Sequence, residues 1–338
     1  MYLICSMGPK INTIADIERL VNAGMTTSRF NFSHSQYSKI EKLIKDIKRN
    51  YPSVQIMQDL QGNKLRVSKR FVGEVLIKKG EKVLFCLDDM YINRFKVSKY
   101  PLIPINYEGD FLDLLGAREI FMKDATMHFR IIKKDSRFIM AEAVKGGVIR
   151  EEKGINLPGI DRKRLRISEK DKKDIEWGVK KGVDIICASY VSGKKDIEDV
   201  RRCIESYSNI EGFKYPKVWS KIECQEGMDN IDEILKISDG IMLGRGDLKA
   251  EVPYYMIPII QEGLLKKMKN SDKPFVIATY VLESSKKEKM PTIGELNDIY
   301  NSIKLGVNGF MLAGEVGTSN NPSFGVEILK DLIEKYTK

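Results

Sequence analysis

Eight short apolar segments recur along the chain, and amphipathic segments with helical periodicity separate most of them. This alternation predicts parallel strands joined by helical crossovers. The apolar segments cover residues 3–7, 27–32, 54–60, 183–191, 217–223, 240–246, 275–281 and 309–315. Candidate helices between them include residues 14–24, 169–182, 230–238 and 293–306, and a last helix at 324–336 would close a ring. The pattern predicts an α/β fold, a (β/α)8 TIM barrel.

The regular spacing breaks once, between the third and fourth apolar segments. Residues 67–153 alternate apolar and polar residues in short stretches that Gly, Asp and Asn turns separate. Such a stretch predicts a small inserted β-barrel domain, which would form a lid over the larger barrel. We therefore expect residues 1–66 and 154–338 to form the catalytic barrel.

The size and composition of the chain suit a folded protein outside the membrane. With 338 residues and 42% hydrophobic content, the chain can bury a large core. No segment approaches the roughly 18 consecutive apolar residues of a membrane span, and the first residues do not resemble a secretory signal. The five cysteines include no CxxC pair, so we expect free thiols. These features predict a cytoplasmic protein with no membrane contact.

The chain is basic, with 57 Lys and Arg residues against 47 Asp and Glu residues, a formal net charge of +10. This balance favours an anionic partner without specifying its kind. The densest basic stretch, residues 161–174, is interleaved with acidic residues and has no aromatic side chain on which a base could stack. We therefore expect a solvated surface there and no nucleic-acid partner.

Polar residues stand in or just after the predicted strands, where a parallel barrel should be apolar. They are Arg29, Asn31, Ser33, Asp59, Ser189, Lys221, Glu223, Arg245, Asp247, Thr279 and Glu315. Taken alone, Lys221 with Glu223 could be a strand salt bridge, and Arg245 with Asp247 a surface turn. Because the carboxyl ends of barrel strands converge on one mouth, their recurrence predicts an active site there.

These side chains also indicate the chemistry of the predicted site. Glu223 and Asp247 supply hard oxygen ligands, which suit Mg²⁺ or Mn²⁺. Lys221 offers a point charge for an oxyanion or a transferring phosphoryl group, and Arg29 offers a forked donor for phosphate oxygens. An anionic, phosphorylated substrate fits both.

Six segments together resemble pyruvate kinase, in the order of that family and with the inserted domain in the family's place. They are RFNFSHS (29–35), EKGINLPG (152–159), EKDKKDIEWGVKKGVDIICASYV (169–191), SKIE (220–223), DGIMLGRGDLKAEVP (239–253) and IATYVLES (277–284). The resemblance runs from residue 3 to about residue 330. It implies Mg²⁺-dependent phosphoryl transfer between phosphoenolpyruvate and ADP, giving pyruvate and ATP.

The resemblance also implies a role for each matching residue. Glu223 and Asp247 would bind Mg²⁺ or Mn²⁺. Lys221, Thr279 and Arg29 would be catalytic, with Lys221 stabilising the enolate and the phosphoryl group in flight. The substrate would bind through Gly246, Asp247, Thr279 and Ser189, and the nucleotide phosphates through Arg29 and Lys153.

Several positions depart from the family pattern. Leu60 and Lys64 stand where many potassium-dependent members have Thr and Glu, while Asn31, Ser33 and Asp59 of the monovalent-cation pocket remain. We expect the Lys64 ammonium to take the place of potassium, so that potassium is not required. Tyr280, Lys249 and the PTIGEL segment (291–296), which in the family lies near the subunit interface, also differ from the usual residues.

The chain stops just after the eighth predicted helix, so we expect the family's C-terminal domain, with its effector site and part of the tetramer contact, to be missing. A tetramer of the usual type is then not expected, and a homodimer stays open. Two other functions also stay open: a metal-dependent lyase or aldolase that forms the enolate of pyruvate or a 2-keto acid, and a non-catalytic pyruvate kinase relic.

Overall fold

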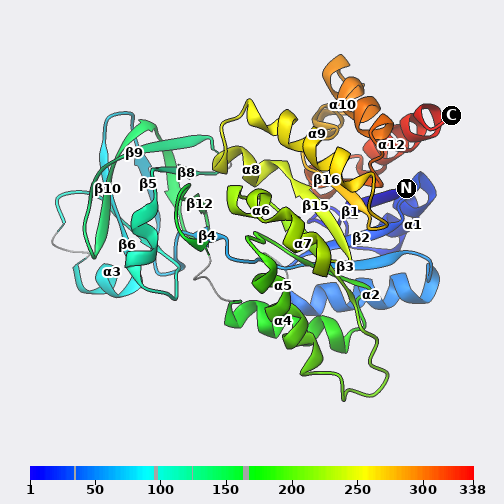
Figure 1. The fold of residues 1–338 in the computed structure, drawn as a ribbon, viewed down its shortest axis with the longest axis horizontal. Helices are drawn as coiled ribbons and strands as arrows, with labels where there is room; N and C mark the ends of the chain where they lie inside the picture. The colour runs from blue at the N-terminus through cyan, green and yellow to red at the C-terminus, as the bar shows by residue number, and fades with distance from the viewer. Residues whose placement is uncertain (34–35, 95–97, 124, 163–166) are drawn as a thin grey trace.

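The structure, a computed structural model, describes residues 1–33, 36–94, 98–123, 125–162 and 167–338. A barrel surrounded by helices forms the larger part, and a smaller unit made mostly of β-strands lies at one end of it (Figure 1). Residues 34 and 35 of the RFNFSHS segment and residues 163–166 of the basic stretch lie outside the described residues.

Eight parallel strands form a closed barrel, and each falls within one of the eight apolar segments of the sequence, apart from one residue at the start of β1. Chain neighbours pair throughout, β3 pairs with β13 across the insertion, and β1 pairs with β17 through Tyr2 and Gly309 to close the ring. The predicted TIM barrel is confirmed. Its strands are β1 (Tyr2–Ser6), β2 (Thr27–Asn31), β3 (Gln55–Asp59), β13 (Ile185–Ala188), β14 (Lys217–Ile222), β15 (Gly240–Gly244), β16 (Phe275–Ala278) and β17 (Gly309–Leu312).

Helices cover the outside of the barrel, and side-chain caps fix the start of several. Thr13 and Asp16 form a capping box at α1, and Thr292 with Glu295 forms another at α10. The helices of the barrel are α1 (Ile14–Ala23), α2 (Tyr37–Asn50), α4 (Glu169–Lys180), α5 (Lys194–Glu205), α6 (Gln225–Asp229), α7 (Ile231–Ile237), α8 (Arg245–Glu251), α9 (Met256–Met268), α10 (Ile293–Lys304), α11 (Gly314–Gly317) and α12 (Pro322–Tyr336), with a 3-10 helix at Glu283–Lys287.

The inserted unit contains a seven-stranded sheet in the order β4-β12-β8-β9-β10-β6-β7, and a separate pair, β5 with β11. Its strands are β4 (Leu65–Arg66), β5 (Glu74–Ile77), β6 (Lys82–Leu87), β7 (Leu102–Ile105), β8 (Glu119–Met122), β9 (Met127–Lys134), β10 (Phe138–Lys145), β11 (Gly147–Arg150) and β12 (Gly154–Asn156), with α3 (Asp88–Arg94) and a 3-10 helix at Phe111–Gly116. A bridge between Val67 and Ile105 brings the two edges of the sheet together, as in a small barrel.

The boundary of this sheet lies slightly outside the predicted one. We expected the inserted domain to cover residues 67–153, but β4 and β12 pair with each other and belong to the inserted sheet. The sheet therefore reaches from residue 65 to residue 156. Strands of two and three residues are too short to show a period in the sequence, which explains the difference.

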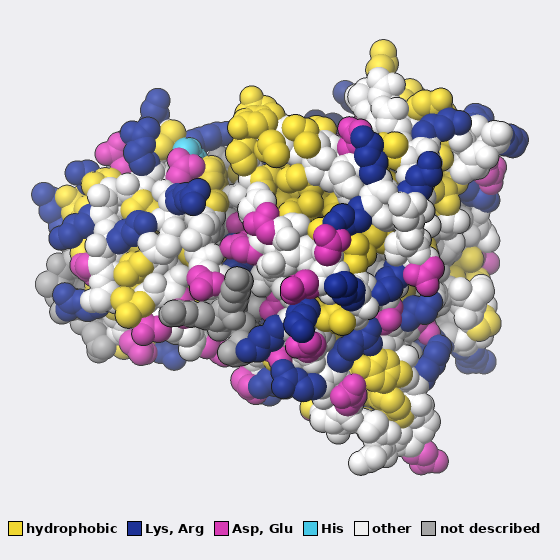
Figure 2. Space-filling view, in the orientation of Figure 1, with side chains coloured by type: hydrophobic (Ala, Val, Ile, Leu, Met, Phe, Trp, Pro, Cys, Tyr) yellow, Lys and Arg dark blue, Asp and Glu magenta, His cyan; other side chains and the backbone are white. Residues whose placement is uncertain are grey.

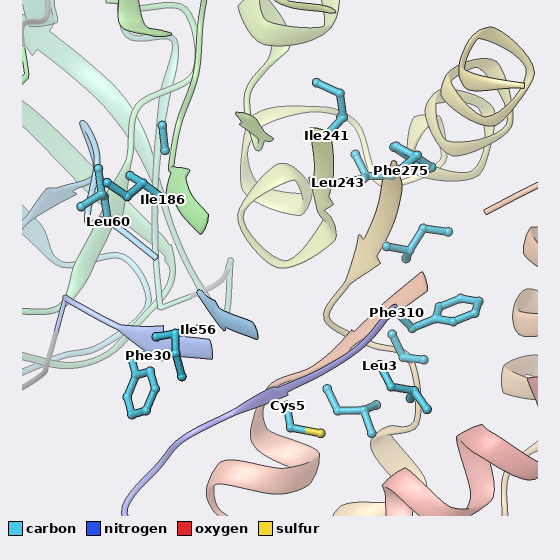
Figure 3. Packing of buried hydrophobic residues seen from close by; sticks show 14 of the residues in the cluster. Leu3, Cys5, Phe30, Ile56, Leu60, Ile186, Ile241, Leu243, Phe275 and Phe310 are labelled. Carbon is cyan, nitrogen blue, oxygen red and sulfur yellow. The ribbon is translucent and has the colours of Figure 1, made fainter. Parts of the chain in front are cut away.

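Alternate residues of the barrel strands face two different cores. On β1, Leu3 and Cys5 pack outward against the helices, and Ile4 faces the barrel interior. Figure 3 shows Leu3 and Cys5 with other members of the outer core. Trp219 fills part of the interior, with the Tyr2 ring in edge contact at 5.2 Å between centroids. The apolar packing holds the strand ends, and therefore the polar residues on them, in fixed relative positions.

All five cysteines are free thiols, as expected, and only Cys203 is partly exposed. Within the described part of the chain, no helix has the length and apolar character needed to cross a membrane.

Candidate functional site

A cavity of about 300 Å³ lies between the carboxyl ends of the barrel strands and the base of the inserted unit. The barrel contributes residues from β2, β14 and α8 and from the segments that follow β3 and β13, and the inserted unit contributes the segment that leads into β12. Nine predicted site residues line it: Arg29, Asn31, Ser33, Lys64, Lys153, Ser189, Lys221, Glu223 and Asp247. The structure thus gathers most of the predicted site in one place.

Asp59, at the end of β3, lies at the centre of a buried charge network. Lys221 Nζ is 2.9 Å from both Asp59 carboxylate oxygens, and Arg29 Nε donates to Asp59 Oδ2 at 2.7 Å. Ser189 Oγ donates to Asp59 Oδ1 at 3.1 Å. Burial opposes the charge of Asp59, but the Lys221 and Arg29 cations outweigh it and lower the pKa of Asp59. Asp59 therefore anchors both cations at the floor of the cavity.

Lys221 on β14 keeps its charge although it is buried. Burial opposes the ammonium, but Asp59 and Glu223 raise the pKa of Lys221 above its usual range. Its Nζ lies 3.7 Å from Glu223 Oε1, as the shared strand face in the sequence predicted. Lys221 thus presents a permanent positive charge to the cavity.

Glu223 and Asp247 differ in how their charge is balanced. Burial and the nearby Asp247 raise the pKa of Glu223, because Lys221 compensates only in part. Burial also acts on Asp247, but Lys64 outweighs it and lowers the pKa of Asp247. The two carboxylates face one cavity with one cation beside each.

The Lys64 ammonium lines the same cavity as Asn31 and Ser33 of the predicted monovalent-cation pocket. It contacts Asp247 Oδ1 at 2.6 Å. Asp59, the third residue of that pocket, is neutralised by Lys221 and Arg29, whereas Asp247 offers Lys64 a carboxylate at the wall of the cavity. That Lys64 takes the place of potassium stays a prediction.

The chemistry of the site fits a small, hard divalent cation. Glu223 and Asp247 supply carboxylate oxygens to the cavity. Among the residues described, there is no group of three or more His, Cys, Asp or Glu side chains that could share a metal ion. Mg²⁺ and Mn²⁺ accept such a site, because they keep several waters and take further oxygens from a substrate. Glu223 and Asp247 could therefore hold either ion.

Thr279 and Gly246 face each other beside this cavity but are not among its described lining residues. The Gly246 N–H donates to Thr279 Oγ1 at 2.9 Å. Thr279 and Tyr280 both have left-handed backbones, with φ of 65° and 55°, which is strained for residues with large side chains. The predicted carboxylate-binding amide and hydroxyl are thus adjacent, on backbone held in an unusual shape.

Arg245 stabilises this strained segment. Its guanidinium donates to Thr279 O at 2.7 Å and Tyr280 O at 2.8 Å, and to Asp298 Oδ2 at 2.5 Å. The alternative of a surface turn at Arg245 is wrong, because its side chain is buried. The two backbone carbonyls and Asp298 satisfy the guanidinium away from solvent.

Some cavity residues were not among the predicted ones. Arg66, Lys123 and Glu152 come from the base of the inserted unit, and Tyr190 follows β13. No single residue type or spacing marks them in the sequence. Tyr190 and Glu152 each carried one signal, because they are adjacent to the predicted Ser189 and Lys153 and lie in segments that resemble the family.

Comparison with known proteins shows the family of the chain. The family model described as the pyruvate kinase barrel domain matches residues 1–326. The chain is 31% identical to the pyruvate kinase of Bacillus licheniformis over 339 residues, which is 98% of this chain and 56% of that protein. It is 32% identical to the pyruvate kinase of Clostridium perfringens (strain 13 / Type A) over 325 residues, which is 95% of this chain and 66% of that protein. The chain thus spans less than two thirds of the length of these relatives.

Proposed function

Because the chain belongs to the pyruvate kinase family, we propose that it transfers a phosphoryl group between phosphoenolpyruvate and ADP, giving pyruvate and ATP. The observation that carries the proposal is the buried Lys221 ammonium, held by Asp59 and next to Glu223 in a cavity that Arg29 and Lys153 also line. Phosphoryl transfer depends mainly on positioning and on neutralising charge, and this cavity gathers cations for both.

In this proposal each side chain acts on a charged part of the substrates. Lys221 would neutralise charge on the enolate oxygen and the transferring group, and Arg29 and Lys153 would hold nucleotide phosphates. The Gly246 and Asp247 N–H groups, Thr279 and Ser189 would bind the phosphoenolpyruvate carboxylate and its surroundings. Glu223 and Asp247 would hold Mg²⁺ or Mn²⁺, which when bound supplies positive charge to phosphate and enolate oxygens.

Lys153 lies on the wall that comes from the inserted unit, so its position supports a role for that unit as a lid. If the lid moves toward the barrel mouth with substrate bound, water would be excluded while the phosphoryl group transfers. This exclusion would favour transfer to ADP over hydrolysis.

Phosphorus NMR of the purified chain with phosphoenolpyruvate, ADP and Mg²⁺ tests the proposal. We expect the phosphoenolpyruvate signal to fall as the ATP γ-phosphate signal rises, and neither change without ADP. Exchange of pyruvate methyl protons without ADP and without ATP formation would instead support the lyase or aldolase. Tight phosphoenolpyruvate binding with neither reaction would support the non-catalytic relic.

We propose that potassium is not required, because Lys64 supplies a fixed cation at the cavity wall. Replacing potassium by tetramethylammonium at constant ionic strength should leave the rate of ATP formation nearly unchanged. A Lys64→Met variant, which lacks this cation, should be slower in both salts. A steep potassium requirement in the unmodified chain would contradict the prediction.

We propose further that the chain forms a homodimer through apolar side chains at the starts of α9 and α10. The exposed ones are Tyr254, Tyr255 and Ile259, just before and on α9, and Met290 and Ile293, just before and at the start of α10. Gln261 joins the two helices by donating to Asp298 Oδ1 at 2.8 Å, and Figure 2 shows hydrophobic side chains over α8 and α9. Sedimentation velocity should give a dimer that Ile259→Lys converts to a monomer, and a monomeric unmodified chain would contradict this.

A further inference from the structure

Tyr190 lies against both carboxylates of the proposed metal site. Its backbone N–H donates to Glu223 Oε2 at 3.1 Å, and its hydroxyl is close enough to the Asp247 carboxylate to help lower the pKa of Asp247. The side chain is buried, and its backbone is left-handed with φ of 54°. Such a backbone is rare for an aromatic residue and is strained. This conformation allows one residue to reach both carboxylates.

The direction of the Tyr190 hydroxyl is fixed from behind. Asn156 Nδ2 donates to Tyr190 Oη at 2.8 Å and to Glu251 Oε1 at 3.0 Å. Because an amide nitrogen can only donate, the Tyr190 hydroxyl accepts from Asn156 and is left to donate its own hydrogen to Asp247. The hydroxyl hydrogen is therefore available to Asp247, and it favours one orientation of that carboxylate.

A buried ion pair holds Asn156 in turn. Arg162 Nη2 donates to Glu251 Oε1 at 2.8 Å, and Arg162 Nη1 donates to Glu226 Oε2 at 3.1 Å. Asn156 ends β12, whose partner β8 belongs to the inserted sheet. A hydrogen-bonded path thus runs from Arg162 through Glu251 and Asn156 to the Tyr190 hydroxyl, which faces Asp247.

We propose that Tyr190 is a positioning residue that keeps Glu223 and Asp247 in the orientations that bind the divalent cation. The inference rests on the proposed function, because it takes these two residues as the metal ligands. Partners behind a metal ligand fix its orientation, and removing one weakens metal binding by about 10- to 100-fold in other sites. Tyr190 is such a partner for both ligands: its hydroxyl faces Asp247, and its backbone amide donates to Glu223.

The test is Mn²⁺ binding to the full chain, measured from the electron paramagnetic resonance signal of free Mn²⁺ during a titration. Tyr190→Phe removes only the hydroxyl, so we expect the Mn²⁺ dissociation constant to rise by about tenfold or more. Thermal unfolding without metal shows whether the variant stays folded. Asn156→Ala, which leaves the hydroxyl without its orienting donor, should weaken Mn²⁺ binding in the same direction by a smaller factor.

Tyr37→Phe is the matched control. The Tyr37 hydroxyl also donates to a carboxylate, Asp174 Oδ1 at 2.5 Å, but Tyr37 is outside the cavity lining. We expect Tyr37→Phe to leave Mn²⁺ affinity unchanged even if it lowers the melting temperature. If a folded Tyr190→Phe chain binds Mn²⁺ as tightly as the unmodified chain does, the inference about Tyr190 is wrong, but the proposed metal site still stands. An unmodified chain that binds no Mn²⁺ would overturn the proposed metal site, and the inference with it.

Discussion

Replacing Lys221 by Met should lower kcat for ATP formation from phosphoenolpyruvate by on the order of 10²–10³-fold or more. The ammonium is buried and held by Asp59 at 2.9 Å, so it is positioned before the substrate arrives. A methionine of similar length keeps most of the packing but supplies no charge where the enolate and the transferring group carry theirs. Phosphorus NMR or a coupled assay for pyruvate measures the loss.

Two controls separate lost chemistry from lost structure. Lys273→Met removes a lysine near the amino end of β16, where its Nζ donates to Lys236 O at 3.2 Å, so kcat should stay close to that of the unmodified chain. Lys221→Met also leaves the buried Asp59 with one cation fewer, which should lower the stability of the variant. The rate of the variant should therefore be measured below the variant's melting temperature. A folded Lys221→Met chain with an unmodified kcat would contradict the role of Lys221.

Replacing Arg162 by Met should lower the free energy of unfolding by about 3–5 kcal/mol at neutral pH. Arg162 and Glu251 form a buried ion pair, with side chains 4% and 1% exposed. Among the described residues, removal of the guanidinium leaves the Glu251 carboxylate buried with the Asn156 amide as its one remaining hydrogen-bond donor. Urea unfolding followed by circular dichroism measures the change. Arg201→Met, at a half-exposed pair with Asp239, should cost no more than about 1 kcal/mol.

The loss in the Arg162→Met variant should depend on pH in a defined direction. Burial already raises the pKa of Glu251 in the unmodified chain, and without Arg162 it should rise further. A carboxyl group with a higher pKa in the folded state binds protons more readily there than in the unfolded chain. Acid therefore favours the folded variant, and its deficit should shrink as the pH falls from about 7.5 to about 5. A deficit that grows over this range would contradict the assignment.

The architecture and much of the site could be predicted from the sequence because they depend on local patterns. Each barrel strand is a short apolar segment, and the polar residues in it or just after it fall at the mouth by the geometry of the fold. Lys221 on β14 and Glu223 directly after β14 are 3.7 Å apart at their charged atoms. The period of a strand was enough to place them together.

Other contacts could not be predicted because they join residues that only the folded chain brings together. Lys64 forms an ion pair with Asp247, which is 183 residues away in the sequence. Asn156, Tyr190 and Glu251 meet across three different segments, and no spacing in the sequence relates them. The buried Arg245 guanidinium donates to the backbone carbonyls of Thr279 and Tyr280. This contact depends on the path of the loop after β16. Charge competition and loop paths decide these cases.

The pairing of β4 with β12 affects how much stability the barrel loses by carrying the insertion. β3 and β13 pair directly, so the chain leaves one barrel strand and returns to the adjacent strand. The β4–β12 ladder already brings the outgoing and returning chain segments together, and the conformational entropy lost in closing a loop grows only slowly with loop length. Lengthening or exchanging the distal part of the insertion should therefore destabilise the barrel strands little. The sequence of that part can then diverge while Lys153 stays at the cavity.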